Sequence, residues 1–260
     1  MTTTVGNLII IITVMLASFA ACGKWDMSPI PPRPSNGKGG EIGITADEGI
    51  EVGNQMRDYR LVVPKEINPE KALPILFAFH AYHGTLKTSM HEYTKLDQLA
   101  HKEGFILVYP KTIEPRWSLE KNNNPDITFF DTLLGYLSSR YNIDLNRVYA
   151  TGMSNGAYFI NILASQRSDI IAAIALHSGE LPLFAVSAKR KYPVMIIHGT
   201  EDKIVKVSEG RKMRDVYRKE GHEVMYIEIA NLDHTWAWEK HDINQKIWAF
   251  FNSHPLRVKE

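Results

Sequence analysis

The segment Arg147-Val-Tyr-Ala-Thr-Gly-Met-Ser-Asn-Gly156 decides the fold of this chain. Its apolar start, residues 148–151, predicts a strand, and the residues after Gly156 have the apolar spacing of an amphipathic helix. Strand, sharp turn and helix are the context in which a G-x-S-x-G motif presents a nucleophilic serine. Glycines are expected there because a side chain would collide with the strand or helix packed against the turn. We therefore expect Ser154 to be a nucleophile; a glycine-rich turn after a buried strand is the alternative.

Strands and helices alternate on both sides of this segment. The pattern predicts an antiparallel hairpin from residues 51–55 and 56–63, and strands at 74–79, 105–109, 148–151, 170–176, 194–197 and 224–229. It predicts helices at 89–102, 126–141, after the Ser154 turn, 205–220 and 242–251. This alternation implies an α/β fold, with a mostly parallel sheet and helices on both faces. No internal repeat and no second domain is evident.

Two later loops carry the partners that a nucleophilic serine needs, which are a base and an acid to orient it. In open α/β sheets such groups lie at the carboxyl ends of strands. Residues 198–202 (HGTED) follow one predicted strand, and residues 231–234 (NLDH) follow the next. Ser154, Asp202 and His234 then form a triad in the chain order nucleophile, acid, histidine.

Other residues of these loops offer alternatives. Glu201 could replace Asp202 as the acid. His198 stands directly at its strand end beside a glycine, which favours a buried, hydrogen-bonded structural histidine. Asp233 is a poor orienting acid for His234, because adjacent side chains rarely face each other. A surface histidine is the alternative for His234 itself.

Serine attack also needs donors for the oxyanion. We expect one to be the N–H of Asn155, directly after the nucleophile, and the other the N–H of Tyr82, in the loop after the early buried strand. His80, His83 and His91 suggest a metal site, but no carboxylate or cysteine joins them at a familiar spacing. The prediction is therefore no metal and no cofactor.

Three tryptophans, Trp117, Trp236 and Trp238, are candidates for lining the substrate cleft. Packing within their loops is the alternative for each. The composition argues against nucleic acid as a partner, because 30 Lys and Arg against 29 Asp and Glu leave a formal net charge of +1. A chain of 260 residues that is 44% hydrophobic can bury one substantial core.

The first forty residues are not part of the predicted fold. Residues 8–21 form an apolar run of signal-peptide length, which is short for a membrane span. The run ends at Cys22, the only cysteine, and resembles a bacterial lipoprotein signal; an ordinary signal peptide is the alternative. Residues 23–41 are rich in Pro, Gly and Ser, which predicts a flexible tether. We expect a signal peptide at 1–21, lipidation at Cys22 with a tether to 41, and an exported, membrane-anchored catalytic domain at 42–260.

Taken together, these motifs resemble those of the polyhydroxybutyrate depolymerase and feruloyl esterase group of α/β-hydrolases (carbohydrate esterase family 1-like). The likeness covers residues 59–251 and rests on RDYRLVVP, FHAYHGT, EGFILVYP, IDLNRVYATGMSNGAY, HGTED and DHTW. It implies the α/β-hydrolase fold, with Ser154 as nucleophile, Asp202 as acid and His234 as base. The chain departs from the group at Ala81 and His83, where further glycines are usual.

The sequence therefore predicts a serine esterase acting on carboxylic esters of the hydroxyalkanoate or feruloyl and acyl-glycan type. Its partners would be a small-molecule, glycan-linked or polymer ester, and a membrane through the lipid anchor. Two alternatives remain: a peptidase or acyltransferase that uses the same triad, and a non-catalytic surface lipoprotein that binds glycans or esters.

Overall fold

The computed structural model describes residues 30–82, 90–182, 187–237 and 241–257. From residue 31 onward these residues form one compact unit. Within the described ranges, the helices are all too short or too polar to cross a membrane. Cys22, His83 and Trp238 lie outside the described residues.

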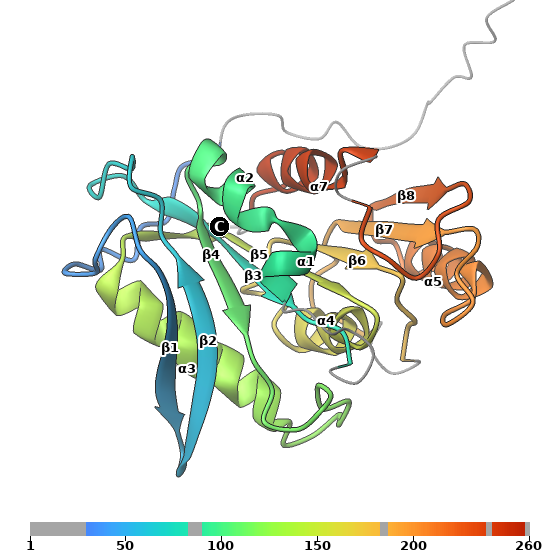
Figure 1. Cartoon of the computed structure of the whole chain (residues 1–260), viewed down its shortest axis with the longest axis horizontal. Helices are drawn as coiled ribbons and strands as arrows, with labels where there is room; N and C mark the ends of the chain where they lie inside the picture. The colour runs from blue at the N-terminus through green and yellow to red at the C-terminus, as the bar shows by residue number, and fades with distance from the viewer. Residues whose placement is uncertain (1–29, 83–89, 183–186, 238–240, 258–260) are drawn as a thin grey trace, which may run out of the picture. The chain divides into compact units, whose positions relative to one another are not determined.

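One eight-stranded sheet forms the centre of this unit, in the order β1-β2-β4-β3-β5-β6-β7-β8 (Figure 1). From β4 to β8 the neighbours pair parallel, whereas β2 pairs antiparallel with both β1 and β4. The strands are β1 Thr45–Val52, β2 Gln55–Val62, β3 Leu73–Phe79, β4 Ile106–Pro110, β5 Ile143–Met153, β6 Ala173–His177, β7 Val194–Gly199 and β8 Val224–Ile229. Strands β3 to β7 are almost wholly buried, as strands covered on both faces must be.

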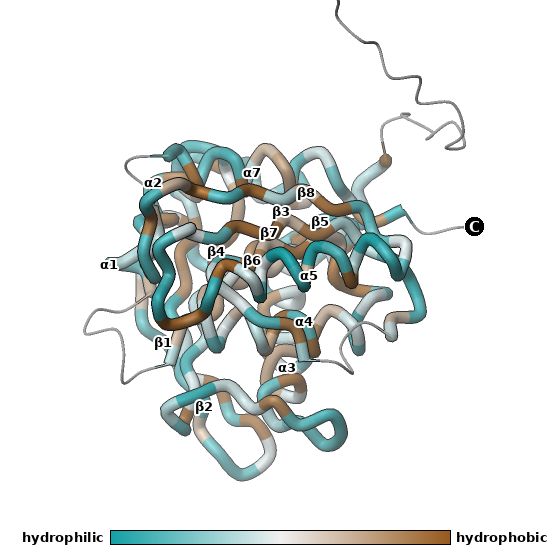
Figure 2. Tube along the Cα trace, turned by 90° about the vertical axis from the view of Figure 1, so that its right-hand side faces the viewer, coloured by the Kyte–Doolittle hydropathy of each residue, from teal (hydrophilic) through white to brown (hydrophobic). Residues whose placement is uncertain are grey.

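Helices cover both faces of the sheet. They are α1 Met90–Thr94, α2 Leu96–Glu103, α3 Pro125–Arg140, α4 Asn155–Gln166, α5 Val207–Lys219 and α7 Ile243–Asn252. The buried residues of α3, α4 and α5 share one apolar cluster, and those of α1, α2 and α7 share a second cluster on the other face. Figure 2 shows α5 largely hydrophilic along its outer side. The predicted layered α/β architecture is thus the observed one.

Three predicted boundaries differ from the structure, two for local backbone reasons and one through strand pairing. The first hairpin strand is β1, not residues 51–55, because the turn lies at Gly53, whose φ of 61° favours glycine. The predicted helix at 89–102 is two helices, α1 and α2, broken at Lys95 with a φ of 55°. Strand β5 begins at Ile143, five residues earlier than expected, where it pairs with Leu73 of β3.

The expected flexible tether is wrong for its second half. The N–H of Arg33 donates to the Asp144 carboxylate over 2.8 Å, and the N–H of Ser35 donates to the Ile143 carbonyl over 2.8 Å. Gly37 lies so close to the carbonyls that end α3 that a Cβ there would overlap them. Composition suggested a linker because Pro and Gly are frequent in both linkers and close backbone contacts. The described segment therefore belongs to the folded unit from residue 31.

Candidate active site

Ser154 lies at the junction of β5 and α4, as the motif predicts. Its φ of 51° and ψ of −121° are unusual for a residue with a side chain, and such a conformation costs about 1–3 kcal/mol. Its N–H donates to the His177 carbonyl over 3.0 Å. A Cβ on Gly156 would run into the carbonyl oxygens of Phe79 and His80, so glycine is needed there. The close approach brings the start of α4 against the end of β3.

Asp202 and His234 are in direct contact. The Nδ1 of His234 lies 2.7 Å from Oδ2 of Asp202, and the other carboxylate oxygen accepts the N–H groups of Ile204 and Val205 over 2.9 and 2.8 Å. A carboxylate can only accept, so Nδ1 of His234 carries the proton and Nε2 has the free lone pair. Among the described residues, Nε2 has no hydrogen-bond partner.

The electrostatics keep Asp202 ionised. The residue is only 5% exposed, and burial by itself raises its pKa. The hydrogen bonds from His234, Val205 and Ile204 outweigh that effect and hold the pKa of Asp202 below its ordinary value. A negative charge therefore faces the imidazole and stabilises it when it becomes protonated.

The alternatives in these two loops occupy other positions. His198 is completely buried, and its Nε2 lies 2.7 Å from the Val205 carbonyl and 3.4 Å from Oδ2 of Asp202, as expected of a buried, hydrogen-bonded histidine. Glu201 and Asp233 are both exposed, and within the described residues neither forms a hydrogen bond or ion pair with His234. The structure therefore brings Asp202, and not Glu201, to the histidine.

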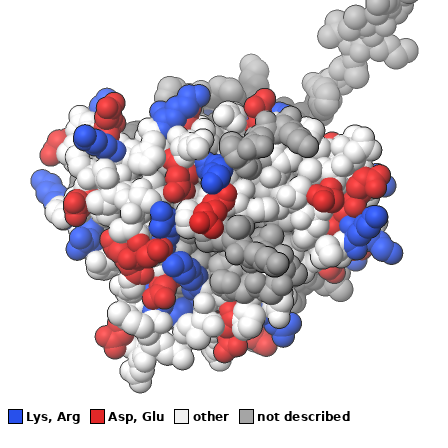
Figure 3. Space-filling model, in the orientation of Figure 1, with Lys and Arg blue, Asp and Glu red and all other residues white. Residues whose placement is uncertain are grey.

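A polar hollow of about 550 Å³ opens beside His234. It is lined by Glu201, Lys203, Ile204, Asn231, Asp233 and His234. On the face shown in Figure 3, acidic and basic side chains are interspersed, without an extended field of one sign. All of the lining residues except Ile204 are polar or charged, so the hollow can offer hydrogen bonds to a ligand.

The tryptophans expected to line a cleft do not do so in the described structure. Trp117 is 0% exposed and Trp236 is 3% exposed. The indole of Trp236 stacks on His177 at 5.0 Å and donates to Asn244 over 2.9 Å. Both residues are therefore packing elements of the site, and the prediction of substrate contact is wrong for them.

Two residues that sequence analysis did not select support the site. His177 is the last residue of β6 and supplies the carbonyl that accepts the Ser154 N–H. Tyr93 of α1 donates its hydroxyl to Thr235 over 2.8 Å and accepts the Trp236 N–H over 2.6 Å, so it ties the His234 loop to the helix layer. A position at a strand end was a signal for His177. The sequence holds no comparable signal for Tyr93, which lies far from this loop in the chain.

Of the three early histidines, His83 lies outside the described residues, and His80 and His91 lie within them. There, no group of three or more His, Cys, Asp or Glu side chains is placed to hold an ion. His80 instead points its Nδ1 at the Ala81 carbonyl, 2.6 Å away.

Comparison with known proteins places this site in a family. The sequence model of the dienelactone hydrolase family matches residues 110–249, more than half of the chain. The chain belongs to the dienelactone hydrolase family. Its match includes the segments that carry Ser154, Asp202 and His234.

This dienelactone hydrolase-family chain is similar to several esterases. It is 29% identical over 168 residues to a bifunctional acetylxylan esterase/xylanase of Neocallimastix patriciarum, with 64% of this chain and 24% of that protein covered. It is 25% identical over 194 residues to feruloyl esterase D of Neurospora crassa, with 71% and 66% covered. The chain thus spans less than two thirds of the length of these relatives. A thermostable esterase shares the fold, with a TM-score of 0.68 at 20% identity over 81% of this chain and 63% of that one.

From the burial of His177, we predict that the free energy of unfolding depends on pH. Its complete burial, with repulsion from His198 and His234, lowers the pKa of His177 to about 3. Below about pH 6.5, the His177 imidazole is protonated in the unfolded chain but stays neutral in the folded one. The free energy of unfolding is therefore highest above that pH, and it falls as the pH decreases toward the pKa of His177 in the folded chain. We expect this group to remove about 1 kcal/mol of unfolding free energy between pH 7.5 and pH 5.5.

Urea denaturation at both pH values measures this effect in the wild type and in His177→Asn. The variant should lose about 1 kcal/mol less than the wild type over the same pH interval. Buried His222, whose pKa is also lowered, contributes equally to both chains. Equal losses in the two chains would contradict the assignment to His177.

Proposed function

We propose that this protein is a serine esterase that hydrolyses carboxylic esters. The observation that carries the proposal is the 2.7 Å contact between His234 and buried, ionised Asp202, which leaves Nε2 of the histidine as a base. The strained backbone conformation of Ser154 supports the proposal, because strained residues are concentrated at active sites and ligand-binding sites. Membership of a hydrolase family and similarity to acetylxylan and feruloyl esterases support it further.

In the proposed reaction, Nε2 of His234 takes the proton of the Ser154 hydroxyl as its oxygen attacks the ester carbonyl carbon. The negative charge moves to the carbonyl oxygen, where the N–H groups of Tyr82 and Asn155 bind it. The protonated imidazole, stabilised by Asp202, gives its proton to the departing alcohol. A water molecule, deprotonated by the same histidine, then attacks the acyl-serine and releases the acid.

The position of Asn155 supports its role as a donor. It is the first residue of α4, and the first N–H groups of a helix have no partner within the helix. The positive end of the helix dipole favours negative charge at the same place. The Ser154 N–H, in contrast, is already used by the His177 carbonyl.

For the substrate, we propose an acyl ester of a glycan, with an acetyl or feruloyl group as the acyl part. The polar lining of the hollow beside His234 supports a hydrogen-bonding alcohol. The similar acetylxylan and feruloyl esterases point the same way. Release of acetate from acetylated xylan, or of ferulate from a feruloyl arabinoside, tests this choice. Turnover of hydroxyalkanoate oligomers alone would favour the polymer esters instead.

The catalytic assignment predicts a graded loss of activity. With 4-nitrophenyl acetate, Ser154→Ala should lower kcat by about 10³-fold or more, and Asp202→Asn by about 10²–10⁴-fold, because its histidine loses the correct tautomer. Glu201→Gln tests the other candidate acid: its carboxylate is exposed and does not pair with His234, so the loss of kcat should be far smaller than with Asp202→Asn. Asp215→Asn is the matched control, since this exposed carboxylate of α5 does not line the hollow and should change kcat by less than about twofold.

Initial rates on purified, folded chains decide between the outcomes. An active Ser154→Ala, or a loss with Glu201→Gln as large as that with Asp202→Asn, would contradict the proposed triad.

We also propose that the protein is exported and anchored through Cys22. The apolar run at residues 8–21, ending in small residues before the only cysteine, supports this proposal. Expressed in a bacterium, the full chain should partition with membranes, whereas Cys22→Ser should not carry lipid and should leave the membrane fraction or remain as precursor. Mass spectrometry of the amino terminus checks the lipid directly. A wild-type protein recovered without lipid would contradict the anchor.

A further inference from the structure

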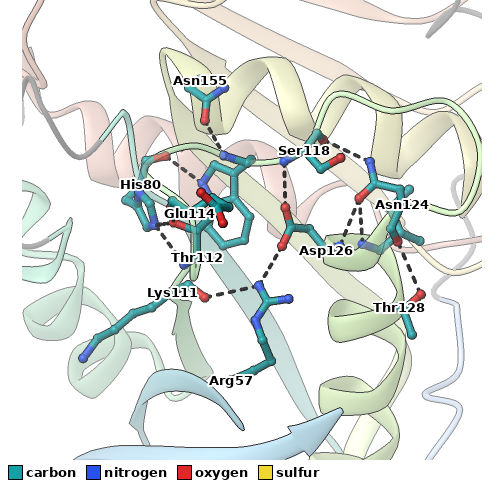
Figure 4. A network of polar contacts seen from close by, with 12 residues as sticks. Arg57, His80, Lys111, Thr112, Glu114, Ser118, Asn124, Asp126, Thr128 and Asn155 are labelled. Carbon is teal, nitrogen blue, oxygen red and sulfur yellow. Dashed lines mark hydrogen bonds and ion pairs between the residues drawn. The ribbon is translucent and has the colours of Figure 1, made fainter. Parts of the chain in front are cut away.

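Trp117 hydrogen-bonds to both segments that carry the proposed oxyanion donors. It lies in the loop between β4 and α3, outside any helix or strand. Its indole N–H donates to the His80 carbonyl over 2.9 Å, two residues before Tyr82. Its backbone N–H donates to Oδ1 of Asn155 over 2.7 Å (Figure 4). A single side chain and its backbone therefore connect the end of β3 to the start of α4.

The position of Trp117 is tightly fixed. The residue is completely buried, and its ring packs edge-on against Phe79 at 5.0 Å and stacks on Phe159 at 5.2 Å with 20° between the planes. Close packing of this kind restricts the rotamers open to a buried side chain. The two hydrogen bonds consequently impose a fixed spacing on the segments they join.

His80 orients the peptide group between Ala81 and Tyr82. The N–H of Thr112 donates to Nε2 of His80 over 3.3 Å, so the ring proton is on Nδ1, which donates to the Ala81 carbonyl over 2.6 Å. The Ala81 carbonyl and the Tyr82 N–H belong to one planar peptide group and point in opposite directions. Holding the carbonyl thus sets the direction of the Tyr82 N–H.

The loop that carries Trp117 is itself anchored. The N–H of Ser118 donates to one oxygen of Asp126 over 2.7 Å, and the other oxygen pairs with Arg57 at 2.6 Å (Figure 4). Arg57 and Asp126 are 3% and 6% exposed, and the Arg57 guanidinium lies 4.1 Å from the Phe129 ring centre. Removing either partner would leave an uncompensated buried charge, so Arg57 and Asp126 hold each other, and with them Ser118, in place.

We propose that Trp117 is a positioning residue for the oxyanion hole: it fixes the Tyr82 and Asn155 amides relative to each other. The inference rests on the proposed esterase function and adds a residue that touches neither substrate nor reacting atoms. The hole acts by preorganisation, and a shift of about 1 Å in such a site costs about 10²-fold in rate. We call Trp117 and its hydrogen bonds to His80 and Asn155 the brace. Because the brace acts on the oxyanion hole, it contributes to kcat more than to KM.

The test compares an O-aryl acetate with its thionoester, in which sulfur replaces the carbonyl oxygen. Sulfur is a poor hydrogen-bond acceptor, so a well-formed oxyanion hole favours the oxygen ester. Trp117→Phe keeps an aromatic ring and removes the indole N–H. We expect it to lower kcat for the oxygen ester by about ten- to a hundredfold, with KM changed less than threefold. The thionoester should lose far less, so the oxygen-to-sulfur preference falls by roughly tenfold.

Asn155→Ala is the second variant, because it removes the other hydrogen bond and keeps the Asn155 backbone amide. It should lower the oxygen-to-sulfur preference in the same direction, and it carries the test if Trp117→Phe does not fold. Trp248→Phe is the matched control: Trp248 is 7% exposed and stacks on Phe105 at 4.1 Å in the apolar cluster on the other face of the sheet. It should lower stability and leave the preference unchanged.

The outcomes separate the brace from the proposed function. If the wild type is active and neither Trp117→Phe nor Asn155→Ala changes the oxygen-to-sulfur preference, the brace is overturned while the esterase stands. If Trp248→Phe shifts the preference as much as Trp117→Phe, the effect is general packing and the brace is also overturned. A folded wild type that turns over neither ester, or an active Ser154→Ala, overturns the esterase and the brace with it.

Discussion

The site depends on the close contact between the start of α4 and the end of β3. That contact exists because Gly156 has no Cβ to meet the carbonyls of Phe79 and His80. Ser154, two residues earlier, has a strained conformation, and the contact places the start of α4, with Asn155, against His80 at the start of the loop that carries Tyr82. A larger residue at this glycine would move Ser154, the proposed nucleophile, and both proposed oxyanion donors at once. The strain is sustained by the buried β5 and α4 on either side.

In the loops that carry Asp202 and His234, the cost of burying a charge is offset by hydrogen bonds. Burial of Asp202 opposes its charge, and three hydrogen-bond donors compensate for the lost water. Each hydrogen bond to a charged group contributes about 1.5–3 kcal/mol, and together the three outweigh the effect of burial on the pKa of Asp202. Because the carboxylate stays ionised, His234 keeps the tautomer in which Nε2 is a base. The site thus combines a carboxylate with hydrogen bonds to both oxygens, at Asp202, with a strained backbone, at Ser154.

Local patterns predicted the layered fold and the positions of Ser154, Asp202 and His234 at strand ends, because a strand, a turn and a chain order are properties of neighbouring residues. The roles of Trp117 and Trp236 could not be predicted in this way. Whether an aromatic residue in a polar loop faces solvent or the core depends on contacts with distant residues, such as His80 for Trp117. The flexible tether predicted for residues 33–40 is wrong for the same reason, since the partners of this segment lie a hundred or more residues later.

The central claim is that Ser154 is the one nucleophile of this site, and covalent labelling tests it most directly. The intact protein would be treated with diethyl 4-nitrophenyl phosphate, which phosphorylates activated serines, and analysed by whole-protein and peptide mass spectrometry. The account predicts one diethylphosphoryl group per chain, on Ser154, with loss of ester hydrolysis in step with labelling. Labelling at another residue, or full ester hydrolysis by a chain labelled at Ser154, would contradict it.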